Sequence, residues 1–575
     1  MSSYLSRAWA RLRSLLPTGG DLATARRRPG RDLLAGLTVA IVALPLALGF
    51  GISSGAGAEA GLATAVVAGA LAAVFGGSNL QVSGPTGAMT VVLVPITQSY
   101  GVSGVLTIGL MAGALLIALA VAKAGRYMAY VPAPVIEGFT VGIACVIGLQ
   151  QVPGALGVPT PKGQNVAVVA FRAAQDFATH PNWSAIAVAL AVAVVMLAGA
   201  RWRPGIPFSL LAVAAATIVS QLARLNVSRI GTLPAGLPAP SLGFLHPGAL
   251  SSLIAPALAV AALAALESLM SAAAADGMSV NHKHDPDREL FGQGLANLAA
   301  PLFGGVPATG AIARTAVNVR AGAGSRLAAL THAVVLAAVI FAAAPLVARI
   351  PLAALAGVLL ATAVRMVEVG SVRAMARATR SDAVVLALTA VATLALDLVK
   401  AVIIGLAVAA LLALRAVAKQ ARIDAVPLHH DLPGDHSEEE HALLAEHIVA
   451  YRIDGPLFFA AAHRFLLELS EVADVHVVIL RMSRITTLDA SGALVLKDAI
   501  DKLRRRGITV MASGIKDGQR QALDALGVLD QLRADGHVFA TTPEAIRAAR
   551  THLEFAGVLP VPAQATAPVT EKVSP

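Results

Sequence analysis

A long series of apolar runs occupies residues 33–420, and this feature limits the possible folds more than any other. Charged residues make up 14% of the 575-residue chain and hydrophobic residues 56%, whereas about a quarter of the residues in a water-soluble domain are charged. Apolar runs of this length are typical of helices that cross a bilayer. We therefore expect a multi-pass membrane protein. Charged residues become denser after residue 421, which predicts a separate water-soluble domain.

The apolar runs divide into fourteen predicted segments, some too short to cross a membrane alone. A full crossing takes roughly 20 residues, so the pieces at 84–98 and 309–319 are predicted to be half-helices preceded by extended backbone. The fourteen segments are 33–53, 58–76, 84–98, 104–122, 130–151, 184–200, 206–223, 250–274, 289–303, 309–319, 327–347, 351–367, 382–398 and 400–418.

Lys and Arg residues are distributed unevenly around these segments. The predicted cytoplasmic loops hold twelve of them and the predicted outer loops six, and seven arginines precede the first segment. Because basic residues concentrate on the cytoplasmic side, we expect both termini in the cytoplasm and the spans in the cell (inner) membrane. The first apolar run is followed by further spans rather than a small-residue cleavage site, so residues 1–32 are not expected to be a cleaved signal.

Two segments broken by Gly and Pro stand third and tenth in the series, at matching places in its two halves. One contains Pro85 and Gly87, and the other contains Pro307 and Gly310. With seven segments in each half, the halves must insert in opposite orientations, as in inverted-repeat transporters. Both breaks are then expected near the bilayer midplane, where irregular backbone is tolerated only beside protein or a water-filled cavity.

The N-termini of the two half-helices would present unpaired N–H groups and positive partial charge to a ligand. We therefore expect the ligand to be an anion. Small residues at these termini would let it approach the backbone closely. Tight helix packing explains small residues equally well, and this alternative remains open. The residues expected to bind the anion are Thr86, Gly87, Ala88, Thr309, Gly310 and Ala311.

Charged residues inside membrane segments are costly, so two of them are functional candidates. Arg314 lies about one turn into the second half-helix and could add positive charge to the anion site; snorkelling to the surface is the alternative. Glu267 lies in the eighth segment and could bind and release a coupling proton. Ser271 lies one turn further on the same face and, with Glu267, could instead hold Na⁺. A static ion pair between Glu267 and Arg314 is a third possibility.

Several classes of function have no support in the sequence. The single cysteine, Cys145, provides neither a disulfide nor a Cys-based metal site. The formal net charge of +10 comes largely from residues that flank the spans, which indicates membrane topology rather than nucleic-acid binding. No segment resembles a nucleotide-binding motif. We therefore expect neither a cofactor nor a bound metal, and a transporter rather than an enzyme.

Five ordered motifs make the chain similar to the SulP anion transporters. They are RDLLAGL from residue 31, VSGPTGA from 82, ESL from 267, GQGLAN from 292 and TGAIART from 309. The resemblance covers nearly the whole chain. The stretch 267–323 is most similar to the bacterial C4-dicarboxylate transporters of that family.

The resemblance implies a seven-plus-seven inverted repeat with core and gate domains, an elevator-type motion and a homodimer. It adds Phe50 in the first span to the anion site and matches Glu267 to the coupling carboxylate of the family. Sodium-coupled bicarbonate members resemble Asp plus Thr where this chain has Glu267 and Ser271, which favours protons here. Leu46 stands where some animal members have Gln, so that polar contact is not expected.

The C-terminal region resembles a STAS domain, an α/β module shared by sulfate transporters and anti-sigma-factor antagonists. Strands are predicted at 448–453, 476–481 and 508–512, with a helix at 491–506 that Ser491 would cap. Ala490 occupies the position of the phosphorylated serine in the antagonists, so that switch is not expected, although a cytoplasmic protein partner is possible.

These predictions give five regions and one preferred function. The regions are a cytoplasmic segment at 1–32, a transmembrane transport domain at 33–420, a linker at 421–446, a cytoplasmic STAS domain at 447–555 and a disordered tail at 556–575. The preferred function is proton-coupled uptake of dicarboxylates such as succinate or fumarate. Alternatives on the same scaffold are a sulfate transporter, a sodium-coupled bicarbonate symporter and a nucleobase transporter; a membrane-tethered STAS sensor is the alternative from another class.

Overall fold

The computed structural model divides the chain into two compact units, Met1–Ala409 and Ala410–Pro575. The residues that the structure describes are 14–163, 165–203, 207–234, 236–246, 248, 250–279, 283–396, 398–420, 422–426, 446–458 and 475–559.

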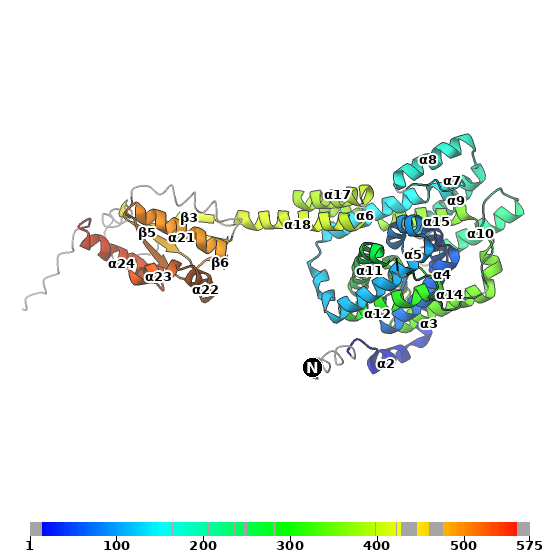
Figure 1. Ribbon diagram of the computed structural model, residues 1–575, viewed down its shortest axis with the longest axis horizontal. Helices are drawn as coiled ribbons and strands as arrows, with labels where there is room; N and C mark the ends of the chain where they lie inside the picture. Colours follow the sequence, from blue (N-terminus) through cyan, green and yellow to red (C-terminus); the bar gives the residue numbers. More distant parts are fainter. Residues whose placement is uncertain are drawn as a thin grey trace, which may run out of the picture. The chain divides into compact units, whose positions relative to one another are not determined.

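The first unit is a bundle of helices (Figure 1). Among the described residues, nine helical stretches are long and apolar enough to cross a membrane. The helices are α2 (Gly19–Arg27), α3 (Pro29–Ser53), α4 (Ala58–Phe75), α5 (Gly87–Val121), α6 (Ala133–Gln150), α7 (Val152–Leu156), α8 (Val166–Thr179), α9 (Trp183–Trp202), α10 (Phe208–Leu222), α11 (Leu250–Met278), α12 (Pro286–Ala299), α13 (Ile312–Arg320), α14 (Arg326–Val347), α15 (Leu352–Met366), α16 (Val369–Ala378), α17 (Arg380–Ala395) and α18 (Leu398–Gln420).

Every one of the fourteen predicted segments overlaps a helix, which agrees with the predicted multi-pass helical class. The third and fourth segments both overlap α5, which is interrupted at Gly101, where φ is 67°. Helices α8 and α16 were not predicted, because their polar residues broke the apolar pattern. The number of crossings therefore stays a prediction.

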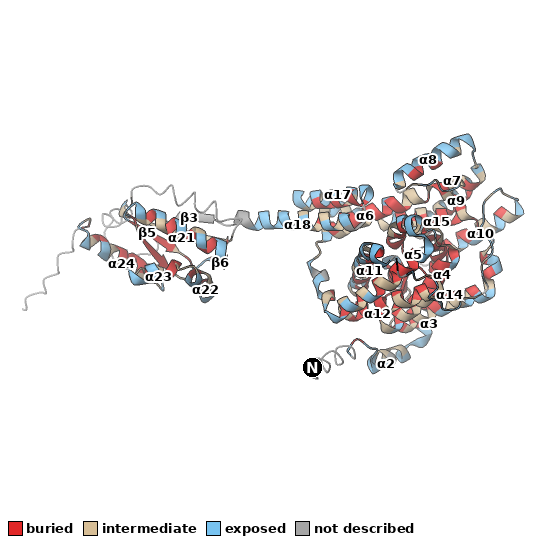
Figure 2. Ribbon diagram, viewed as in Figure 1, coloured by how far each residue is buried: buried red, intermediate tan, exposed pale blue. Residues whose placement is uncertain are grey.

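Close helix contacts depend on small residues. A Cβ atom at Gly61 on α4 would lie 2.9 Å from the Cα of Gly51 on α3, so these two helices touch through their backbones. Such contacts are typical of membrane helices, where small residues bring backbones together. Buried residues concentrate in the centre of the unit, whereas α18 is largely exposed (Figure 2).

The N-terminal helix α2 is attached to the bundle by a carboxylate between two arginines. Asp21 accepts a hydrogen bond of 2.7 Å from Arg288 and one of 3.2 Å from Arg326. Burial raises the pKa of Asp21, but the Arg288 hydrogen bond and the two positive charges outweigh it and lower the pKa to about 2. Residues at the start of α2, α12 and α14 are thereby joined.

The second unit contains a six-stranded sheet whose strands follow the order β3-β4-β5-β7-β8, with β6 also paired to β4. Strands β3 and β4 are antiparallel and the other pairs are parallel. The elements are β3 (Arg422–Val426), β4 (Ile448–Leu457), β5 (Val477–Arg481), β6 (Ile485–Leu488), β7 (Thr509–Ser513), β8 (Val538–Phe539), α21 (Ala490–Arg505), α22 (Asp517–Ala525), α23 (Val528–Ala534) and α24 (Thr542–Phe555).

Side chains alternate across this sheet, as the period of a strand requires. Val478 and Leu480 of β5 join the buried cluster that includes residues of α21, α22 and α23. Val477 and Ile479 join a second cluster with residues of α24. Helices thus cover both faces of the sheet (Figure 1).

Two local predictions for this unit were wrong. Asp489, rather than Ser491, caps α21, since its Oδ1 accepts a 2.7 Å hydrogen bond from the Gly492 N–H. The region predicted to be a linker, 421–446, contains strand β3, because its backbone pairs with β4. Residues 427–445 of that linker and residues 560–575 of the predicted disordered tail lie outside the described residues.

Candidate functional site

The two broken segments meet in the centre of the first unit. Strand β1 (Ser83–Gly84) pairs with β2 (Thr309–Gly310) in antiparallel register, Ser83 opposite Gly310. Helix α5 follows β1, and helix α13 follows β2. The structure therefore brings together the N-terminal residues of the two half-helices, which lie far apart in the sequence.

Polar side chains hold the irregular backbone around these strands. The Asn297 side chain accepts a hydrogen bond from the Ala308 N–H at 2.8 Å and donates one to the Ala308 carbonyl at 2.9 Å. The Gln293 amide donates to the Ser83 hydroxyl at 2.6 Å. Buried backbone groups at membrane depth need such partners. The sequence motif GQGLAN was noticed only for its family resemblance, and its polar residues were missed as supports of the site.

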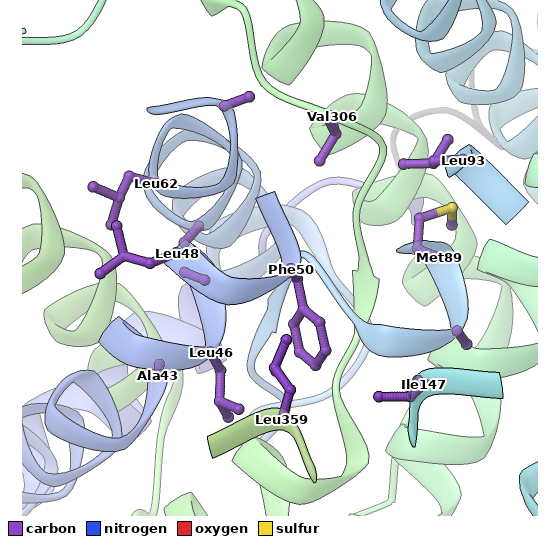
Figure 3. Packing of buried hydrophobic residues seen from close by; sticks show 14 of the residues in the cluster. Ala43, Leu46, Leu48, Phe50, Leu62, Met89, Leu93, Ile147, Val306 and Leu359 are labelled. Carbon is purple, nitrogen blue, oxygen red and sulfur yellow. The ribbon is translucent and has the colours of Figure 1, made fainter. Parts of the chain in front are cut away.

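Thr86 links the first half-helix to the membrane carboxylate. Its hydroxyl accepts a hydrogen bond from the Met89 N–H at 3.3 Å, which caps α5. The same hydroxyl donates to Glu267 Oε2 at 2.8 Å. A Cβ atom at the neighbouring Gly87 would contact Ile147 and would lie 3.2 Å from Phe50 Cε1. Phe50 therefore lies against the start of α5, as Figure 3 shows.

Arg314 contributes a buried positive charge from the second half. Arg314 is 1% exposed, so its side chain does not snorkel to the surface. Nη2 donates to the Pro85 carbonyl at 2.6 Å, whereas Nη1 is buried with no protein partner among the described residues. A Cβ atom at Gly84, where φ is 152°, would lie 2.6 Å from Nη1. Glycine at this position leaves room for the guanidinium.

Helix α11 contacts both broken segments, β1–α5 and β2–α13, through three polar residues. Glu267 accepts the bond from Thr86, and Ser268 accepts a 2.9 Å bond from the Gly310 N–H. The Ser271 hydroxyl lies 3.0 Å from the Thr315 hydroxyl of α13. Sequence reasoning missed Ser268 and grouped Ser271 with Glu267; the structure directs the Ser271 hydroxyl to a helix contact.

The site contains one carboxylate and one guanidinium that are close enough to interact electrostatically. In the described part of the chain, Glu267 and Arg314 form no direct ion pair; each bonds to the β1–α5 segment instead, Glu267 to Thr86 and Arg314 to Pro85. The remaining predicted residues, Ala88 and Ala311, are buried at the start of α5 and as the N-cap of α13. The arrangement offers positive charge beside a group able to carry a proton. Within the described ranges, no group of three or more His, Cys, Asp or Glu residues could hold a metal ion.

Comparison with known proteins supports this interpretation of the fold. Residues 30–389 match the sulfate permease family, and residues 442–545 match the STAS domain. The chain belongs to the sulfate permease family. This SulP protein is 36% identical over 515 residues to the putative sulfate transporter YvdB of Bacillus subtilis, covering 87% of this chain and 94% of the relative. It is 32% identical to the bicarbonate transporter BicA of Synechocystis, covering 86% and 90% of the two chains.

Solved structures agree with the family assignment. The transmembrane domain of a cyanobacterial BicA matches 67% of this SulP protein and 98% of that chain, with 32% identity and a TM-score of 0.59. Murine Slc26a9 in the inward-facing state covers 94% and 95% with a TM-score of 0.80; at 17% identity it supports the fold alone. This SulP protein is a multi-pass anion transporter and not an enzyme. The relatives named here are sulfate and bicarbonate transporters, so they do not support the predicted special similarity to dicarboxylate transporters.

Proposed function

We propose that this SulP protein is a secondary active symporter of protons and a small inorganic oxyanion, sulfate or bicarbonate. The observation that carries the proposal is the Thr86 hydroxyl, which joins the start of an anion-facing helix to Glu267. The relatives YvdB, a putative sulfate transporter, and BicA, a bicarbonate transporter, favour these anions over dicarboxylates. The buried Arg314 argues against an uncharged nucleobase, because such a substrate would bring no counter-charge to the guanidinium when Glu267 is protonated.

The charges of the site explain why proton and anion would move together. When Glu267 is ionised, its charge offsets that of Arg314 and an anion gains little. When Glu267 is protonated, the charge of Arg314 is no longer offset, and the two helix N-termini add to its field. Each ligand then promotes binding of the other, as thermodynamic reciprocity requires. A typical coupling of about 1–3 kcal/mol would make anion binding about 5–150 times tighter after protonation.

The surroundings of Glu267 favour a proton over Na⁺ as the coupling ion. Na⁺ would need several oxygen ligands, and the sequence offered Ser271 as one. The Ser271 hydroxyl instead bonds to Thr315, and the Pro85 carbonyl accepts from Arg314. Thr86 donates to the carboxylate at 2.8 Å, and Thr309 is a second hydroxyl neighbour of it.

The proposal includes the arrangement of the protein in the membrane. The transport domain at 33–420 would cross the cell (inner) membrane fourteen times with both termini in the cytoplasm. We further propose a homodimer, an elevator-type motion of the substrate site and a cytoplasmic STAS domain at 447–555 that binds a regulatory protein. Basic residues in the predicted inner loops support this orientation.

Uptake by proteoliposomes tests the proposal. Labelled sulfate and bicarbonate should accumulate when the outside is acidified, and each should compete with the other better than succinate does. Glu267→Gln should abolish the dependence on the proton gradient, because glutamine cannot release a proton. Glu59→Gln, at an exposed carboxylate on α4, is the matched control and should behave like the wild type. If anion accumulation by Glu267→Gln followed the proton gradient as in the wild type, the coupling role of Glu267 would be refuted. If uptake by the wild type required Na⁺, Na⁺ and not the proton would be the coupling ion.

A further inference from the structure

A pocket of about 540 Å³ with a mixed, mostly apolar lining lies between α3, α5, α6, α8 and α15. Its lining contains amide and hydroxyl groups and no charged side chain among the described residues. Both polar atoms of the Gln150 side chain are buried there without a protein partner in the described part of the chain. Neighbouring Gln151 and Ser53 bond to each other at 3.2 Å. A pocket of this size, with unpartnered amide atoms at its wall, has room and partners for water.

On three helices, the residue one turn away from the pocket lining is a large apolar side chain. On α3, the N–H of Ser54 in the pocket lining bonds to the Phe50 carbonyl at 2.9 Å. On α6, the Gln151 N–H bonds to the Ile147 carbonyl at 3.2 Å. On α15, Leu355 lines the pocket and Leu359 follows one turn later. The next level after the pocket along these helices is therefore formed by Phe50, Ile147 and Leu359, before the candidate site.

Three apolar side chains occupy the level between them. Phe50, Ile147 and Leu359 are 6%, 1% and 1% exposed and belong to one buried cluster. Phe50 and Ile147 abut the position of Gly87 at the start of α5, and Leu359 lies 3.0 Å from a Cβ atom built at Gly49, which lines the pocket. Figure 3 shows Leu359 and Ile147 on two sides of the Phe50 ring. An apolar layer of this kind excludes water and hydrated ions.

We propose that the pocket is a hydrated outer chamber that receives the anion, and that Phe50, Ile147 and Leu359 form the seal between this chamber and the Thr86 site. The inference rests on the proposed transport function, because only a transporter needs a route to a buried site. Helix α3 starts on the predicted cytoplasmic side, and the pocket lies near its C-terminal end, which assigns the chamber to the opposite side. Neutral amides and hydroxyls suit a chamber that admits an anion without holding it.

Cysteine labelling from outside intact cells tests the chamber. The parent is the full-length chain with Cys145→Ala, because Cys145 is the single native cysteine. Gln150→Cys reports on the chamber and Thr86→Cys on the site, and the probe is a negatively charged, membrane-impermeant methanethiosulfonate. We expect Gln150→Cys to react at least tenfold faster than Thr86→Cys. Equal rates, or no reaction at Gln150→Cys, would overturn the proposal.

Truncation of the seal provides a second measurement. Adding Leu359→Ala to Thr86→Cys should raise its labelling rate at least fivefold, while the rate at Gln150→Cys should change less than twofold. Leu336→Ala, the same truncation at a fully buried leucine on α14, is the matched control and should leave both rates unchanged. Should Leu359→Ala fail to fold, Leu359→Val serves in its place. An equal effect of the two truncations would refute the seal.

Anion flux through the Cys145→Ala parent separates this inference from the proposed function. A parent that moves sulfate or bicarbonate but shows no labelling contrast contradicts the chamber alone. A parent that moves neither anion under any ion gradient contradicts the proposed function, and with it the role assigned to the chamber, even if the labelling contrast is present.

Discussion

The hydrogen bond between Thr86 and Glu267 should appear as an energetic coupling in a double-mutant cycle. The bond is 2.8 Å long and joins a hydroxyl to a carboxylate. Hydrogen bonds to charged groups contribute about 1.5–3 kcal/mol in water-soluble proteins. Membrane proteins give smaller couplings, about 0.6 kcal/mol on average and at most about 1.7 kcal/mol, because the unfolded chain finds other partners in the membrane. We expect about 1.5 kcal/mol here, near the upper end of the membrane-protein range, since the bond joins a hydroxyl to a buried carboxyl group.

The cycle compares Thr86→Val, Glu267→Met and the double variant with the wild type. Thr86→Val also removes the N-cap of α5, in which the Thr86 hydroxyl accepts from the Met89 N–H, at a cost of about 1 kcal/mol. This loss occurs with and without Glu267→Met, so it cancels in the coupling energy. Methionine resembles glutamate in shape and accepts no strong hydrogen bond. The measurement is the free energy of unfolding in detergent micelles at neutral pH.

A second cycle with Thr90→Val serves as the control. The Thr90 hydroxyl donates to the Thr86 carbonyl at 2.9 Å and lies near the Phe50 carbonyl, without a bond to Glu267. Thr90→Val and Glu267→Met should therefore be additive within about 0.5 kcal/mol. A Thr86–Glu267 coupling below about 0.5 kcal/mol, or one equal to the Thr90 value, would refute the reasoning that Thr86 connects the half-helix to the carboxylate.

Three further predictions concern a glycine, a partly buried ion pair and a histidine. Gly84→Ala should reduce anion uptake at least tenfold, because the new Cβ would displace the guanidinium of the site. Gly101 also has a positive φ, but no atom lies near its Cβ position, so Gly101→Ala should reduce uptake less. Equal losses of uptake in the two variants would contradict this prediction. Asp21→Asn should lower the free energy of unfolding at pH 7 by about 1–2 kcal/mol. In the wild type this contribution should persist above pH 4 and disappear as pH falls towards 2, because the Arg288 bond helps keep the pKa of Asp21 at about 2. An unchanged unfolding curve for the variant would be inconsistent with the ion pair. Burial lowers the pKa of His537, so the unfolded state takes up more protons than the folded state below about pH 6.5. The STAS domain should therefore unfold at a lower temperature at pH 5.5 than at pH 7.5, and this temperature difference should shrink in His537→Gln. A difference of the same size in the variant would exclude His537 as its cause.

The apolar segments and their interruptions were predictable because they are local properties of the chain. A helix that crosses the membrane must be long and apolar, and residues such as Pro85 and Gly87 announce the end of regular structure within a few positions. Helices α8 and α16 escaped prediction because their amphipathic patterns do not resemble a span. Strand β3 escaped it because a strand near the end of a sheet is defined by its partner rather than by its own residues.

The site was only partly predictable. Arg314 and Glu267 were conspicuous because charges are rare in apolar segments. Ser268 and Asn297 were not, since serine and asparagine are common and their importance depends on which backbone atoms lie nearby. The misassigned cap of α21 has a similar cause, because Asp489 and Ser491 are both good capping residues and only the backbone path decides between them.

The sequence by itself determined the membrane class, the paired breaks and the sign of the expected ligand. These follow from composition, periodicity and helix polarity, which neighbouring residues set. The tertiary structure decided that β1 and β2 pair, that Thr86 binds Glu267 and that Ser271 bonds to Thr315 instead. Such contacts join residues more than 40 positions apart, and their geometry depends on how all the helices pack together. One sequence pattern is compatible with several such arrangements, and only packing selects among them.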